Sequence, residues 1–121
     1  MRIKSKIHNY EVIWADAIEY LRNLEDKKTL ILIDSTVNKI HRNLIPLRKK
    51  YLAIKPTEES KSLNGIFDLI RQVLALGVRK DYFLIGIGGG IIQDITGFIA
   101  SILFRGVDWI FIPTTLLAQC D

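Results

Sequence analysis

Short apolar runs alternate along the chain with segments whose apolar residues recur at helical spacing. The runs at residues 29–33, 51–54, 82–87 and 109–112 predict strands, and the first has the composition of a strand covered on both faces. Residues 7–14 predict a further strand, and residues 15–24 a short helix. Strands that alternate with helices through short connections predict an α/β fold with a mostly parallel sheet and helices on both faces.

The remaining segments predict helices of different kinds. Residues 60–76 form a helix that Gly77 ends, and its predicted apolar side consists of Leu63, Ile66, Phe67, Ile70, Val73 and Leu74. Residues 91–104 are apolar nearly all round, which predicts a buried helix that Arg105-Gly106 ends. Pro113-Thr114-Thr115 opens a last helix that stops at Asp121. Because this helix looks interrupted, we expect the chain to be a piece of a longer protein.

A glycine run, Gly86-Ile87-Gly88-Gly89-Gly90, lies where the predicted strand 82–87 turns into a helix. Glycines at such a junction let the backbone approach an anion, and the first N–H groups of the helix point at it. The run departs from the dinucleotide fingerprint G-x-G-x-x-G, because Ile91 replaces the last glycine. It is therefore a phosphate turn or a tight turn that only serves strand–helix packing.

Polar loops follow three of the predicted strands, at residues 34–36, 88–94 and 114–115. Parallel strands end at one edge of a sheet, and ligands bind beyond that edge in open α/β sheets. The convergence of the loops is stronger evidence for a ligand site than the glycines alone.

Composition narrows the class of protein. At 121 residues, with 49% apolar and 25% charged residues, the chain is about one globular domain. Its one cysteine excludes an internal disulfide, and the isolated His8 and His41 do not predict a metal site. No apolar stretch reaches the roughly 18 residues of a membrane span and the N-terminus lacks a secretory pattern, so we expect a cytoplasmic protein with no membrane partner.

The net charge of +4 is spread along the chain. Its one dense patch, Arg48-Lys49-Lys50, has no interleaved aromatic residues and is interpreted as a solvated surface. We expect no nucleic-acid partner, whereas a phosphorylated small molecule suits the charge.

Three motifs make the chain recognisable. The segments Gly88-Gly89-Gly90-Ile91-Ile92-Gln93-Asp94, Phe104-Arg105-Gly106 and Pro113-Thr114-Thr115-Leu116-Leu117-Ala118-Gln119-Cys120-Asp121 resemble the 3-dehydroquinate synthase family of sugar-phosphate cyclases in order and spacing. Glu58-Glu59-Ser60-Lys61-Ser62-Leu63 is similar to a further family element, although Thr57 stands where glycine is usual. The resemblance covers about residues 29–121.

The resemblance implies that residues 1–121 are a Rossmann-like N-terminal domain that holds NAD. The implied cofactor-binding positions are Asp34, Ser35, Thr36, Glu58, Lys61, Gly89, Gly90, Ile91, Asp94, Thr114 and Thr115. Backbone N–H groups of residues 89–91 would face the pyrophosphate, and Asp34 and Thr36 the adenosine end. Asp94 and the two threonines would lie on the nicotinamide side.

The resemblance also implies the chemistry and the parts that complete it. A seven-carbon keto-acid phosphate, a small sugar phosphate, would be cyclised with phosphate elimination, as in the shikimate pathway of aromatic amino acid biosynthesis. Arg105, from the neighbouring subunit of a homodimer, and Asp121 would contact this substrate. The catalytic residues and a zinc or cobalt ion would belong to a C-terminal domain absent from this chain, so we expect no catalytic residue here, and the chain alone to be an inactive part of a lyase that binds NAD weakly.

Some of these residues, and the function itself, have a second interpretation. Asp34 and the two threonines at 114–115 are equally good helix caps, and Arg105 alone suits a helix dipole. Gln93 and Cys120 depart from the usual glycine and valine, which keeps a related cyclase with another substrate open. A metal-dependent polyol dehydrogenase of the same superfamily is a more distant alternative, and the string from Pro113 to Asp121 argues against it. The non-enzymatic alternative is a nucleotide-binding or regulatory module.

Overall fold

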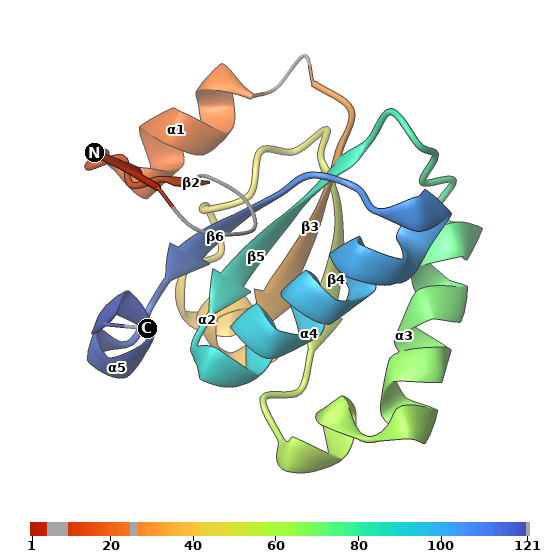
Figure 1. The fold of residues 1–121 in the computed structure, drawn as a ribbon. Coiled ribbons are helices and arrows are strands. Elements are labelled where there is room, and N and C mark those ends of the chain that lie inside the picture. Colours follow the sequence, from red (N-terminus) through yellow and green to blue (C-terminus); the bar gives the residue numbers. More distant parts are fainter. Residues whose placement is uncertain (5–9, 25–26, 121) are drawn as a thin grey trace.

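The computed structural model describes residues 1–4, 10–24 and 27–120, and its centre is a parallel sheet. The sheet has four strands in the order β4-β3-β5-β6, with bounds β3 (Thr29–Asp34), β4 (Lys50–Ile54), β5 (Phe83–Gly88) and β6 (Trp109–Pro113). From β3 the chain adds β4 on one side and then β5 on the other, so the direction of winding reverses between β3 and β5. Figure 1 shows the strands fanning toward the edge where α2 begins.

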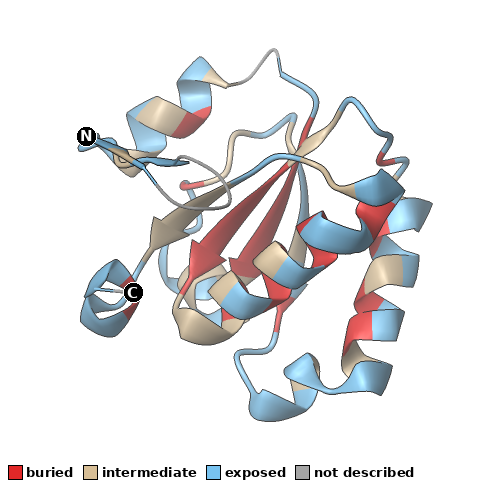
Figure 2. Ribbon diagram, viewed as in Figure 1, coloured by how far each residue is buried: buried red, intermediate tan, exposed pale blue. Residues whose placement is uncertain are grey.

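Helices cover both faces of the sheet, as predicted. Side chains of β3 alternate, so Leu30 and Leu32 face one cluster while Ile31 and Ile33 face the other. The first face carries α3 (Leu63–Ala75) and α4 (Gly90–Ile102), and the second carries α1 (Ala17–Asn23) and part of α2 (Ser35–Ile40). β3 and β5 are almost wholly buried between these layers (Figure 2).

The predicted apolar side of the 60–76 helix is partly wrong. The chain first forms a 3-10 turn, η1 (Glu58–Lys61), and α3 starts only after Ser62, whose hydroxyl caps it by accepting from Gly65 N. From that start the sheet-facing stripe is Ile66, Leu69 and Val73, whereas the predicted members Leu63, Phe67 and Leu74 are exposed. The sequence pattern is broad enough to fit two neighbouring faces, and packing on the sheet selects one.

The prediction that the 91–104 helix is buried all round is also wrong. Its buried residues, Ile92, Ile95, Thr96, Ile99 and Ala100, form one stripe on the sheet. Phe98 and Ile102 point outward and are 51% and 47% exposed, because no described element covers that side. The helix ends at Ile102, and a short turn, η2 (Leu103–Arg105), follows with positive φ at Phe104 and Arg105.

Near the two ends of the chain, the predicted helices are present, whereas the predicted first strand is much shorter in the structure. The predicted strand 7–14 is reduced to β2 (Tyr10–Glu11), which pairs antiparallel with β1 (Arg2–Ile3), and residues 7–9 of the prediction lie outside the described residues. The predicted helix 15–24 is α1, and the predicted last helix is α5 (Leu116–Cys120). Within the described ranges, every helix is too short or too polar to cross a bilayer.

Candidate functional site

The three polar loops meet at the carboxyl edge of the sheet. β3, β5 and β6 are parallel neighbours, so their last residues lie side by side. Thr114 N donates to Gly88 O at 2.8 Å, and a Cβ built on Gly88 would lie 3.2 Å from the Asp34 Cβ. A Cβ built on Gly89 would lie 3.1 Å from Thr115 Cγ2. The predicted convergence is confirmed, and it falls at the point where the winding of the sheet reverses, which is where open α/β sheets bind ligands.

The helix that leaves the glycine turn begins without a side-chain cap. Gly89 is the N-cap of α4, and the first backbone bond of the helix runs from Gln93 N to Gly89 O. The N–H groups of residues 90–92 therefore have no partner within the helix. Among the described α-helices this start is unlike the others, whose first turns are capped by Asp16, Asp34, Ser62 and Thr115. Uncapped N–H groups at the positive end of a helix dipole suit an anion.

Glycines of β5 explain why the fingerprint glycine is not needed at Ile91. An added Cβ would lie 2.6 Å from Thr96 Oγ1 at Gly86 and 2.6 Å from Ile92 Cγ1 at Gly88. The close approach of strand and helix is therefore made by glycines on the strand. A Cβ on Gly90 would meet nothing within 4 Å, so this glycine borders open space above the turn.

Thr96 belongs to this arrangement and was missed by the sequence analysis. It is fully buried, and its hydroxyl donates to Ile92 O at 2.7 Å. A hydroxyl that bonds the carbonyl four residues earlier is satisfied without leaving the helix. The available sequence signal was a lone polar residue on the buried stripe of an apolar helix.

Lys61 joins two other predicted positions. Its Nζ lies 2.7 Å from Asp94 Oδ2 and 3.6 Å from Glu58 Oε2, which links η1 to the first turns of α4. The hydrogen bond to Asp94 is the main cause that raises the pKa of Lys61 above its ordinary value, so the ammonium stays charged at neutral pH. The structure thus brings Glu58, Lys61 and Asp94 together, although 33 positions separate Lys61 from Asp94 in the sequence.

Asp34 caps α2 with one oxygen. Its Oδ1 accepts from Thr36 N at 2.7 Å and from Val37 N at 3.4 Å. Its other oxygen, Oδ2, has no hydrogen bond among the described residues, so the cap leaves one acceptor available at the carboxyl edge. Ser35 is half-buried and Thr36 is exposed beside it.

Of the two predicted substrate-binding positions, the structure places only Arg105, and it does not lie at this edge. Arg105 follows α4, whose 13 residues at about 1.5 Å each carry the chain roughly 20 Å back toward the opposite edge of the sheet. Asp121 lies outside the described residues. Arg105 therefore does not contact the glycine turn of its own chain.

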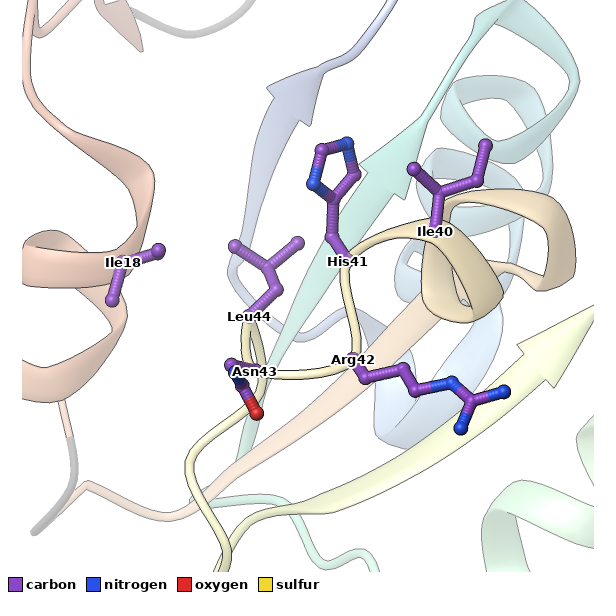
Figure 3. A pocket seen from close by; sticks show the side chains of 6 residues that line it. All are labelled: Ile18, Ile40, His41, Arg42, Asn43 and Leu44. Atoms are coloured by element: carbon purple, nitrogen blue, oxygen red, sulfur yellow. The ribbon is translucent and has the colours of Figure 1, made fainter.

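A hollow of about 250 Å³ lies elsewhere, between α1 and the segment after α2. Figure 3 shows Ile18 on α1 facing Leu44, whereas the side chains of His41, Arg42 and Asn43 point in different directions. Small-molecule sites usually have a few polar groups that point toward one another, and these side chains do not. Among the described residues, His41 also belongs to no group of three or more side chains that could hold a metal ion.

Comparison with known proteins adds relatives of known activity. Residues 51–121 match the family model described as 3-dehydroquinate synthase N-terminal. The 3-dehydroquinate synthase of Streptococcus equi subsp. equi (strain 4047) is 32% identical over 131 aligned residues, which cover 100% of this chain and 36% of that protein. The chain thus spans about a third of the length of this curated relative.

Solved structures give the same picture of the fold. A 2-deoxy-scyllo-inosose synthase complexed with carbaglucose-6-phosphate, NAD+ and Co2+ is 26% identical, with a TM-score of 0.66 over 87% of this chain and 32% of that one. The 2-epi-5-epi-valiolone synthase of Streptomyces hygroscopicus subsp. jinggangensis 5008 has a TM-score of 0.79 over 100% of this chain and 37% of that one. At 24% identity it shows the shared fold alone.

Proposed function

The chain belongs to the 3-dehydroquinate synthase family, and from this premise we propose that it is the NAD-binding domain of a longer sugar-phosphate cyclase. The observation that carries the proposal is the uncapped start of α4 at the reversal point of the sheet, beside Asp34. The NAD+ in the related 2-deoxy-scyllo-inosose synthase structure supports it.

The residues at the carboxyl edge fit a dinucleotide. The N–H groups of Gly90 and Ile91 would donate to the pyrophosphate together with that of Gly89, and the open space over Gly90 lets phosphate oxygens come close. Oδ2 of Asp34 would accept from ribose hydroxyls while Oδ1 keeps its cap, so one carboxylate fills both roles that its position after β3 allows.

Lys61 and Asp94 would form the wall on the nicotinamide side. The ion pair neutralises Asp94 and links η1 to α4, and further donors of the Lys61 ammonium would be available to the cofactor. Thr114 and Thr115 border the turn from β6; the Thr115 hydroxyl caps α5 at 3.2 Å from Ala118 N, and that of Thr114 makes no hydrogen bond among the described residues. These residues would bind and orient NAD, which when bound supplies hydride uptake and return.

For the whole protein we propose cyclisation of a seven-carbon keto-acid phosphate with phosphate elimination, the 3-dehydroquinate synthase reaction of the shikimate pathway. The curated relative supports this substrate, whereas the 2-deoxy-scyllo-inosose synthase supports a cyclase that acts on another sugar phosphate. The longer protein would supply the divalent metal ion and the catalytic residues and would act as a homodimer in the cytoplasm. Arg105 would then reach the substrate of the neighbouring subunit, which agrees with its distance from its own glycine turn.

Two measurements test the proposal at different levels. The first is NAD binding by titration calorimetry with Asp34→Asn, which keeps the cap because asparagine caps as well as aspartate. We expect a loss of affinity of about threefold to tenfold, since a charged acceptor becomes neutral. Asp16→Asn makes the same change at the cap of α1, where Asp16 Oδ1 accepts from Glu19 N at 3.0 Å, and should bind NAD as the unaltered chain does.

Equal affinity in both variants would mean that Asp34 is only a cap.

The second measurement is phosphate release by the longer protein given NAD, a divalent metal and the seven-carbon phosphate. Release from a different sugar phosphate instead would assign the related cyclase activity. NAD binding without release from any sugar phosphate would favour a nucleotide-binding module, and turnover by the 121-residue chain alone would contradict the proposed division of labour.

A further inference from the structure

A second polar hollow lies at the opposite, amino-terminal edge of the sheet. Its volume is about 170 Å³, and the residues that line it are Lys27, Lys28, Thr29, Arg48, Lys49, Lys50 and Tyr82. In the sequence, Arg48-Lys49-Lys50 is an isolated basic patch. β3 and β4 are parallel neighbours with Leu30 opposite Lys50, so the fold places Lys27 and Lys28 beside that patch.

Two of these ammonium groups are held in place by contacts to backbone carbonyls. Lys49 Nζ donates to Lys27 O at 2.6 Å, and Lys50 Nζ donates to Leu76 O at 2.8 Å. Lys28 is paired with Asp81 at 2.6 Å, outside the lining. An ammonium carries three donors, so the contact of Lys50 to the Leu76 carbonyl orients its ammonium and leaves donors for a ligand. No carboxylate is found among the described residues that line the hollow.

Thr29 supplies an independent indication of a ligand. The residue is 4% exposed, and its hydroxyl is the buried side-chain group without a hydrogen-bond partner among the described residues. Buried polar groups are nearly always paired, because an unpaired one loses its hydration without compensation. A hydroxyl in a lining that also holds Lys27, Arg48 and Lys50 can donate to an anion that these side chains attract.

We propose that this hollow, the amino-edge pocket, binds a phosphate group, as inorganic phosphate or as the phosphate of a small ester. Lysine, arginine and threonine are donors to tetrahedral oxyanions. A water molecule needs about 10–15 Å³ by the same measure of volume, so about 170 Å³ readily holds the five heavy atoms of phosphate.

The shape favours one phosphate group over a nucleic-acid strand. Single strands bind along extended basic grooves with several aromatic rings on which bases stack. Here the lining holds one aromatic residue, Tyr82, and Lys50 Nζ lies 5.8 Å from the centre of its ring. The pocket is at the other end of β3 from Asp34, so it is separate from the proposed NAD site.

The test is a phosphate titration of the protein at constant ionic strength, followed by amide shifts in heteronuclear NMR. We expect shifts at residues 27–29, 48–50 and 82. The variant pair Lys27→Gln with Arg48→Gln should weaken binding at least tenfold, since it removes two charges whose side chains make no described hydrogen bond. Lys4→Gln with Lys39→Gln removes the same charge elsewhere and should leave the affinity within about twofold. Phosphomonoesters of a small sugar, titrated in parallel, distinguish the free anion from an ester.

Thr29→Val separates a built pocket from a generally basic surface. Valine has the shape of threonine without the unpaired hydroxyl, so without phosphate the variant should unfold at the same or a higher temperature. It should also lose most of the stabilisation that phosphate gives the unaltered protein. Shifts confined to residues 88–92, equal losses in the two double variants, or unchanged affinity in Thr29→Val would each overturn the proposal. So would tighter binding of a short oligonucleotide that is insensitive to Thr29→Val.

Discussion

Two alanine substitutions two residues apart test the geometry of the glycine turn. In Gly88→Ala the added Cβ would lie 2.6 Å from Ile92 Cγ1 and 2.9 Å from Ile92 Cβ. Ile92 is fully buried and β-branched, so it cannot rotate away. In Gly90→Ala the added Cβ meets nothing within 4 Å. The same methyl group is therefore added once to a filled space and once to an open one.

The two substitutions should change the free energy of unfolding in different directions. Overpacking at Gly88 should cost about 1–3 kcal/mol, which lowers the unfolding temperature by roughly 4–12 °C in a domain of this size. Replacing Gly90 in the first turn of α4 should leave stability unchanged or raise it by at most about 1 kcal/mol, because alanine loses less backbone entropy than glycine. Thermal unfolding followed by circular dichroism measures both.

NAD binding gives the pair its functional readout. If the pyrophosphate lies against the start of α4, the methyl of Gly90→Ala occupies its approach, and calorimetry should show at least a tenfold loss of affinity in a fully folded protein. The reasoning is refuted if Gly90→Ala unfolds as early as Gly88→Ala, or if Gly88→Ala is as stable as the unaltered chain. Unchanged NAD affinity in Gly90→Ala would place the cofactor elsewhere.

Four further substitutions test the packing and the charges. In chemical unfolding, Leu69→Ala should cost about 2–4 kcal/mol and Phe67→Ala less than about 1 kcal/mol, because Leu69 is buried against the sheet and Phe67 is exposed. Similar costs for the two variants would mean that α3 packs on its other face. The hydrogen bond between Lys28 and Asp81 lowers the pKa of Asp81 and raises the pKa of Lys28. The stabilisation by this pair is therefore lost as the pH falls below 3.8 and as it rises above 10.5. Asp81→Asn should make the free energy of unfolding less dependent on pH in both of these ranges. Thr96→Val should cost about 0.5–1.5 kcal/mol for the lost bond to a backbone carbonyl, and no change in unfolding would show that this bond is immaterial.

The sequence by itself determined most of the elements and the place of the candidate site. Continuous apolar runs marked the four strands of the sheet, and the glycine run marked the turn, because both patterns are written in consecutive residues. Parallel strands end at one edge whatever their order, so the convergence of Asp34, the glycine turn and Thr114 followed as well. The family resemblance then indicated which ligand this edge is expected to bind.

Only the tertiary structure decided which distant residues meet. The order β4-β3-β5-β6 and the register of each pair bring Lys49 to Lys27 and let Lys61 reach Asp94, and local spacing in the sequence predicts neither contact. The buried face of α3 also depended on the sheet, since its apolar residues occupy more than half of the helix and periodicity cannot choose between overlapping stripes. Local patterns specify what a segment becomes, whereas close packing in three dimensions selects the face that it buries and the partners that it contacts.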